Sequence, residues 1–130
     1  MDLVVGAAIL SGGRVLAARR TRPAELAGRW ELPGGKLAVG EDPALGLVRE
    51  IDEELGCLIV IDGWLPGEVP IGGGRWLRVA LARLDSGRPV PREHDRLSWL
   101  AAGELDSVDW LPADRPFVEL LRPVLAVTPQ

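Results

Sequence analysis

The chain has 130 residues, of which 47% are hydrophobic and 26% charged, and its net charge is −4. This composition indicates one soluble globular domain over 1–130 and argues against a nucleic-acid polymer as ligand. A single cysteine excludes an internal disulfide and fits a reducing cytoplasm, and no apolar stretch is long enough to cross a membrane.

The chain is predicted to open with a hairpin. Residues 3–10 are apolar and follow no basic segment, so we expect a buried strand and not a signal peptide. Two glycines at 12–13 indicate a turn, after which 15–19 returns as the second strand. A short strand is expected around Glu31, and the following Pro-Gly-Gly lets the backbone approach a ligand closely.

The region after this strand carries the start and stop signals of a helix over 43–55. Asp42 is suited to the N-cap, Pro43 to the first helical position and Gly56 to the C-terminal cap. On a helical wheel the apolar residues share one face: Ala44, Val48, Ile51 and Leu55, with Leu47 at its edge.

The second half of the chain is predicted to alternate strands with a final helix. The predicted strands are 57–61, 76–84 and 97–100, with a weaker, proline-containing one at 64–71 and a helical turn at 101–105. The final helix spans 115–125, and Pro123 predicts a kink or an early end near Arg122. The tail at 127–130 is expected to be disordered. This order predicts an α+β fold, a mixed sheet sandwiched between helices in an α/β/α arrangement.

Three carboxylates of the 43–55 helix, Glu50, Glu53 and Glu54, are predicted to gather on the face opposite the apolar one. Like charges at these spacings repel each other, and Arg49 is the sole basic residue of the helix. Converging carboxylates suit a hard divalent cation, Mg²⁺ or alternatively Mn²⁺. A solvated acidic surface is the alternative reading of such a run.

The spacing of these residues resembles the signature of the Nudix hydrolase family, G-x5-E-x7-R-E-U-x-E-E-x-G-U, in which U is aliphatic. The matching positions are Gly35, Glu41, Arg49, Glu50, Ile51, Glu53, Glu54 and Gly56, and Cys57 departs from the last aliphatic position. The resemblance implies metal-dependent hydrolysis of a nucleoside triphosphate at the β-phosphorus, which yields a monophosphate and pyrophosphate.

The resemblance also implies roles for individual residues. Glu50, Glu53, Glu54 and the backbone carbonyl of Gly35 are the expected metal ligands, Glu53 also activates water, and Arg49 pairs with carboxylates such as Glu41. The string W-E-L-P-G-G-K resembles the MutT branch of the family, which implies that Lys36 lies near phosphates and that Arg20 contacts the nucleotide. The alternative interpretation of Arg20, as an ordinary surface arginine without a nucleotide contact, is equally supported by the sequence. A loop carboxylate is expected to assist, and Glu93 is the first candidate.

The choice of base is expected to depend on the C-terminal part. The segment L-P-A-D-R-P resembles the P-A-N-E-P segment of MutT, where the asparagine recognises 8-oxoguanine; Asp114 occupies that position here. A carboxylate accepts hydrogen bonds, so it suits the N4 amino group of cytosine. E-H-x-x-L-x-W followed by P-A-D-x-P also looks like CTP pyrophosphohydrolases related to MutT. Trp110 is a further candidate at the base, and a simple helix cap is the alternative for Asp114.

These observations predict a diphosphatase for CTP, dCTP and modified cytosine nucleotides. The alternatives are an 8-oxo-dGTP diphosphatase, a hydrolase of ADP-ribose or other nucleoside diphosphate derivatives, and a non-catalytic nucleotide-binding regulator. We expect small-molecule nucleotides as partners and a monomer or weak homodimer. His94, the single histidine, is interpreted as a surface loop residue without a catalytic role.

Overall fold

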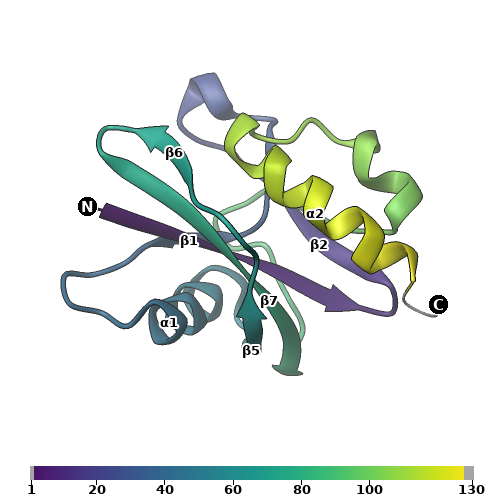
Figure 1. The fold of residues 1–130 in the computed structure, drawn as a ribbon, viewed down its shortest axis with the longest axis horizontal. Helices are drawn as coiled ribbons and strands as arrows, with labels where there is room; N and C mark the ends of the chain where they lie inside the picture. The colour runs from purple at the N-terminus through teal and green to yellow at the C-terminus, as the bar shows by residue number, and fades with distance from the viewer. Residues whose placement is uncertain (1, 128–130) are drawn as a thin grey trace.

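The computed structural model describes residues 2–127, and over this range an eight-stranded mixed sheet lies between two helices (Figure 1). The strands are β1 (Asp2–Ser11), β2 (Arg14–Arg19), β3 (Trp30–Glu31), β4 (Gly34–Lys36), β5 (Leu58–Trp64), β6 (Val69–Gly72), β7 (Arg75–Ser86) and β8 (Arg96–Leu100). The helices are α1 (Pro43–Leu55) and α2 (Arg115–Ala126), and the 3₁₀ turns are η1 (Ala24–Leu26), η2 (Ala102–Ser107) and η3 (Pro112–Asp114). The predicted α/β/α arrangement is confirmed. Of the predicted tail, residues 128–130 lie outside the described range.

The centre of the sheet is formed by β1 and β7, which run parallel, with β2 and then β3 beyond β1 and β5 beyond β7. The short strands β3 and β4 pair with two different neighbours, β2 and β1. The segment 30–36 therefore crosses from the edge of β2 to β1. At the crossing, the Ala7 amide donates a hydrogen bond to the Pro33 carbonyl at 2.8 Å. This crossing places the Gly-Gly-Lys segment beside α1.

The core has two halves because successive residues of β1 face opposite sides of the sheet. Val5, Ala7 and Ile9 pack with Leu47, Ile51 and Leu55 of α1, all fully buried. Ala8 faces the other side, where Phe117, Leu121 and Leu125 of α2 cover the sheet. Figure 1 shows the two helices on opposite sides of the strands.

Helix α1 begins and ends where its capping signals predict. The Asp42 carboxylate accepts a hydrogen bond from the Leu45 amide at 3.0 Å, Pro43 opens the helix, and Gly56 closes it with φ of 67°. These local interactions satisfy backbone groups that the helix ends leave free. The metal-ligand candidates therefore stand on a rigid element.

Helix α2 differs from its prediction at the C-terminal end. It does not end near Arg122 but continues through Pro123 to Ala126. Pro123 falls in the last turn, where the missing amide removes only one of the terminal hydrogen bonds. Leu125 beyond it is buried in the core, which favours continuation. Within residues 2–127, no helix combines the length and apolarity that a membrane crossing requires.

Candidate functional site

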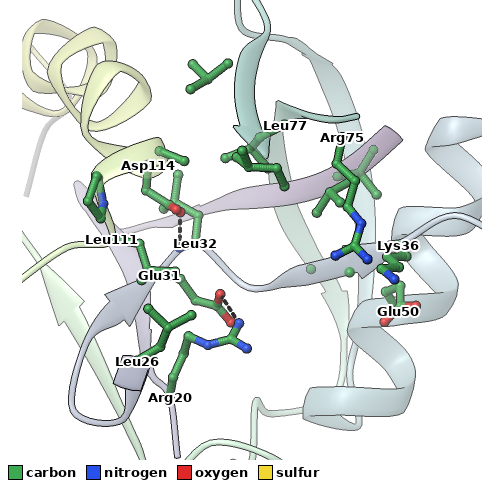
Figure 2. A pocket seen from close by; sticks show the side chains of 18 of the residues that line it. Arg20, Leu26, Glu31, Leu32, Lys36, Glu50, Arg75, Leu77, Leu111 and Asp114 are labelled. Carbon is green, nitrogen blue, oxygen red and sulfur yellow. Dashed lines mark hydrogen bonds and ion pairs between the residues drawn. The ribbon is translucent and has the colours of Figure 1, made fainter. Parts of the chain in front are cut away.

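A cavity of about 860 Å³ opens between the β6–β7 hairpin, the 30–36 segment, α1 and η3. Its volume lies within the range of small-molecule sites, roughly 300–1,000 Å³. Figure 2 shows Glu50 at one end and Leu32, Leu111 and Asp114 at the other. Gly35, which packs against Glu50, and Glu54, one helical turn from it, also line the cavity. The cavity therefore joins an acidic end to a mainly aliphatic end that contains a single carboxyl group.

The acidic end is built where the backbone of β4 meets α1. A Cβ added to Gly35 would lie only 2.5 Å from Glu50 Oε2, so glycine lets this carboxylate pack directly on the backbone. Glu50 and Glu54 are one helical turn apart and share one stripe of α1, whereas Glu53 points about 100° away from Glu54. The glycine at position 35 and the i,i+4 spacing of Glu50 and Glu54 together bring the oxygen atoms of these three residues to one end of the cavity.

Burial makes these two carboxylates costly to ionise. Desolvation, reinforced by the charges of Glu31, Glu50 and Glu93, raises the pKa of Glu54 to about 8. Desolvation also raises the pKa of Glu50, against the opposing attraction of Arg49. Glu54 Oε2 is buried and has no hydrogen-bond partner among the described residues. A nearby positive charge would lower the free-energy cost of ionising Glu54.

The oxygen donors at this end fit a hard divalent cation such as Mg²⁺ or Mn²⁺. Glu50, Glu54 and the Gly35 carbonyl are the groups that would hold it. Within residues 2–127, however, no three Asp, Glu, His or Cys side chains are already gathered as a metal centre.

The third predicted ligand, Glu53, lies outside the cavity lining. Its side chain is 56% exposed, and both of its oxygens lie 3.1 Å from Arg49 Nη1. Arg49 also binds both oxygens of Glu41, at 2.7 and 2.9 Å, which ties the helix to its preceding loop. For Glu53 to join a metal site, its carboxylate has to leave Arg49.

Glu93 reaches the cavity from the loop before β8. Its carboxylate lies 3.1 Å from Arg22 Nη2, and its carbonyl accepts from the Thr21 hydroxyl at 3.2 Å. The neighbouring Arg92 donates to the Asp52 carbonyl at 3.3 Å, near the C-terminal end of α1. The loop is thus fastened to both the β2 end and α1, and Glu93 is held near the acidic end.

Asp114 lies at the opposite end of the cavity and is only 4% exposed. Its Oδ2 accepts a hydrogen bond from the Leu32 amide at 2.8 Å, which Figure 2 shows as a dashed line. The side chain makes no capping hydrogen bond to α2, so the simple helix-cap interpretation does not describe it. Burial raises the pKa of Asp114 to about 8, although the Leu32 hydrogen bond opposes the shift.

A polar cluster lies between the two ends of the cavity. Arg20 Nη1 lies 2.8 Å from Glu31 Oε1, and Glu31 Oε2 lies 2.8 Å from His94 Nε2. Arg20 is thus fixed at the cavity and is not a free surface arginine. His94 is 8% exposed, which contradicts the surface-loop interpretation. The surface-loop interpretation rested on the position of His94 in a predicted loop, and its contact with Glu31, 63 positions away, could not be read from that position.

Besides Arg49, whose Nη2 lies 3.2 Å from Glu50 Oε1, the positively charged groups near Glu50 include Lys36 and Arg75 of the cavity lining. Lys36 follows Gly35 in β4, as its motif predicts. Arg75, at the start of β7, was not predicted; its one signal is its position directly after the Gly72-Gly73-Gly74 turn. Figure 2 shows its guanidinium extending toward Lys36 and Glu50.

Trp110 does not border the cavity. It is 1% exposed, and its indole N–H donates to the Leu105 carbonyl at 2.7 Å within the core. The expectation that Trp110 contacts a base is therefore wrong in this structure. The neighbouring residues Leu111, Pro112 and Ala113 line the cavity instead.

The chain is similar in sequence to known families and proteins over most of its length. The model of the NUDIX domain matches residues 2–121. A Mycobacterium tuberculosis protein named "Putative 8-oxo-dGTP diphosphatase 2" is 44% identical over 120 residues, covering 90% of this chain and 85% of that protein. The Escherichia coli CTP pyrophosphohydrolase is 30% identical over 97% of this chain and 95% of its own length.

Solved structures show the same fold. The solution structure of the E. coli ORF135 protein superposes with a TM-score of 0.80 at 31% identity, covering 95% of this chain and 92% of that one. The MutT NUDIX hydrolase of Burkholderia pseudomallei gives a TM-score of 0.75 at 35% identity, over 91% of this chain and 95% of that one. Sequence and fold thus point to one family.

Proposed function

The chain belongs to the Nudix hydrolase family, and from this premise we propose that it is a Mg²⁺-dependent diphosphatase of CTP, dCTP and modified cytosine nucleotides. Enzymes of this group act on nucleotide phosphoanhydrides, and the relatives are named as diphosphatase and pyrophosphohydrolase. The proposed products are the nucleoside monophosphate and pyrophosphate. The choice of cytosine rests on one observation, the orientation of the buried Asp114 carboxyl.

Asp114 offers one free oxygen to a base. Its Oδ2 is occupied by the Leu32 amide, so Oδ1 remains for a ligand in the cavity. The N4 amino group of cytosine is a single exocyclic donor that matches one free acceptor. Donation to Oδ1 favours the ionised carboxylate, and this lowers the pKa of Asp114 when the nucleotide binds.

An 8-oxoguanine base makes a different demand. Its N1–H and N2 amino groups form two adjacent donors, which a carboxylate matches best with both oxygens. At Asp114 the second oxygen already accepts from Leu32, so a two-donor edge would have to share it. This geometry favours cytosine over 8-oxoguanine.

The rest of the cavity suits the triphosphate. Lys36 and Arg75 stand near Glu50 and provide positive charge for phosphate oxygens, while Arg20 lies between them and the base end. A divalent cation held by Glu50, Glu54 and the Gly35 carbonyl would neutralise phosphate charge and lower the pKa of a bound water. Glu93 is the candidate that accepts a proton from the attacking water, because it lines the cavity from the opposite loop. Glu53 is proposed to join the ligands after separating from Arg49.

An 8-oxo-dGTP diphosphatase is the second candidate. The observation that favours it is the 44% identity to the M. tuberculosis protein of that name. Both substrates need the same carboxylates and cations at the phosphate end, so only the base end distinguishes them.

A panel of substrates at concentrations well below KM tests the proposal, because initial rates then compare kcat/KM. Pyrophosphate release is measured in Mg²⁺ with CTP, dCTP and 8-oxo-dGTP, ADP-ribose is scored by monophosphate release, and EDTA serves as the blank. We expect the cytosine nucleotides to exceed 8-oxo-dGTP by about tenfold or more, corresponding to one hydrogen bond to a charged group. Faster turnover of 8-oxo-dGTP would reverse the assignment of the base, and turnover restricted to ADP-ribose would overturn the triphosphate assignment.

A further inference from the structure

His94 is buried in a position that connects the two ends of the site. Its side chain is only 4% exposed, and Nε2 lies 2.8 Å from Glu31 Oε2. The other Glu31 oxygen lies 2.8 Å from Arg20 Nη1. Because a carboxylate only accepts hydrogen bonds, the proton of the neutral imidazole belongs on Nε2. Glu31 is therefore fixed between two donors, one of which is Arg20 in the cavity wall.

The second ring nitrogen, Nδ1, is buried and has no partner among the described residues. With the proton on Nε2, Nδ1 is an acceptor. A buried polar atom without a hydrogen bond is destabilising, so a donor is needed beside it. Glu31 does not supply it, because its Oε2 lies against Nε2, the other ring nitrogen.

A small second cavity of about 60 Å³ lies next to His94. It is lined by His94, Glu31, Glu54, Glu93 and residues 20–22. The volume is enough for one or more water molecules, and the walls are polar. Glu54 is one of these lining residues, and its Oε2 is the other buried side-chain atom without a partner in the described range. A water that donates one hydrogen to Nδ1 and one to Glu54 would satisfy both atoms.

We propose that His94 is a positioning residue that holds Glu31 directly and Glu54 through a water in this small cavity. One ring thereby fixes the nucleotide contact Arg20 and the metal-ligand candidate Glu54 at the same time. This role goes beyond the proposed function and rests on it only for the kinetic part of the test below. The position of the ring proton does not depend on which nucleotide is the substrate.

The first experiment reads the ring proton directly. Because His94 is the single histidine, a long-range ¹H–¹⁵N spectrum of the full chain contains one imidazole and needs no assignment by mutation. We expect the neutral ring to carry its proton on Nε2 and not on Nδ1. A protonated Nδ1, or an averaged signal from two tautomers, would overturn the proposal. This measurement needs neither metal nor nucleotide, so its failure is separate from a failure of the proposed function.

Two substitutions then separate the two contacts of the ring. The amide nitrogen of H94Q can take the place of Nε2 and keep the Glu31 bond. The amide oxygen of H94N can take the place of Nδ1 as an acceptor, but its shorter side chain cannot reach Glu31. We expect H94N to raise the nucleotide KM about tenfold with Mn²⁺ affinity nearly unchanged. We expect H94Q to weaken Mn²⁺ binding about tenfold and to leave the nucleotide KM nearly unchanged. Mn²⁺ binding is measured by calorimetry without nucleotide.

The exposed Arg88 of the same loop provides the control, and R88A should change neither quantity. Circular dichroism and thermal unfolding show whether each variant is folded. Equal changes of KM and Mn²⁺ affinity in both histidine variants would indicate a merely structural side chain and overturn the proposal, as would wild-type values in both. If both variants unfold, the proposal is still tested by the position of the ring proton in the spectrum of the wild-type protein.

Discussion

The ionisation of Glu54 makes the metal-free protein less stable as the pH rises. Burial and the neighbouring carboxylates raise the pKa of this group from 4.5 to about 8. The folded protein therefore holds the Glu54 proton more tightly than the unfolded chain does. Between these two pKa values the folded state binds more protons, so the free energy of unfolding falls with rising pH. The loss is complete once both states are ionised, above about pH 8.

The size of this effect follows from the shift. A shift of about 3.5 pKa units corresponds to at most about 5 kcal/mol, at 1.36 kcal/mol per unit. A domain of this length has a total stability of about 5–15 kcal/mol, so the effect is easily measured. Asp114, whose pKa is also raised to about 8, contributes with the same sign. Comparison with a Glu54→Gln variant isolates the share of Glu54, because glutamine resembles the protonated acid and does not titrate.

Urea unfolding of both proteins in EDTA, from pH 5 to pH 9, measures the difference. At pH 5 the two should be about equally stable, and at pH 9 the wild type should have lost several kcal/mol more than Glu54→Gln. Mg²⁺ should reduce the loss in the wild type alone, because a cation binds the ionised carboxylate. Parallel curves for the two proteins would show that Glu54 is not buried in a site that resists ionisation.

Three further predictions concern the base, the metal and the phosphates. Asp114→Asn can keep the Leu32 hydrogen bond and turn its amide toward the base, so kcat/KM for CTP should fall about tenfold or more; an unchanged ranking of bases would remove Asp114 from recognition. Glu53→Gln should reduce kcat by orders of magnitude while unfolding stability changes by less than about 1 kcal/mol, because the Arg49 pair is largely exposed. Wild-type turnover in that variant would exclude Glu53 from the reaction. Arg75→Ala should raise KM for the triphosphate about tenfold with little change in thermal stability, and equal KM values would place the phosphates elsewhere.

Local signals in the sequence predict the helix that carries the metal ligands. Asp42, Pro43 and Gly56 set the ends of α1 through contacts within a few residues of each other, and the structure reproduces its bounds. Every strand except β4 is also recovered, with ends that shift by at most three residues apart from the weak β6 segment. Such features depend on neighbours in the chain, so the sequence contains enough information to place them. The glycines of β4 predict only an end to the preceding strand, and β4 forms by pairing with the distant strand β1.

Contacts between segments that are distant in the sequence explain why the predictions for His94 and Trp110 are wrong. His94 is buried because Glu31 lies opposite it, and Trp110 enters the core because its indole reaches Leu105. Neither outcome follows from composition or from spacing within its own loop. The position of Arg75 likewise depends on pairing between distant strands. β1 pairs with β7 on one side, opposite Arg75, and with β4 on the other, opposite Lys36, so both cations come to the same end of β1.

The helical wheel also explains why the three glutamates are not equivalent. It correctly places Glu50 and Glu54 on one stripe, but only packing against β4 decides that this stripe is removed from solvent and faces the cavity. Glu53 then falls toward Arg49, its partner four residues earlier, and remains solvated. A wheel drawn for an isolated helix has no means of separating buried carboxylates from an exposed one.

The charge balance of the cavity indicates why the metal is needed. Of the described residues that line it, five are carboxylic acids and four are basic, so the fully ionised site would repel a nucleoside triphosphate. With Glu54 and Asp114 protonated, as their pKa values of about 8 favour at neutral pH, the lining becomes slightly positive. Binding of a divalent cation replaces the proton of Glu54 with a larger charge, and binding of an amino donor favours loss of the proton from Asp114. Metal and base should therefore each release protons on binding, and nucleotide affinity should rise more steeply with pH when Mg²⁺ is present than when it is absent.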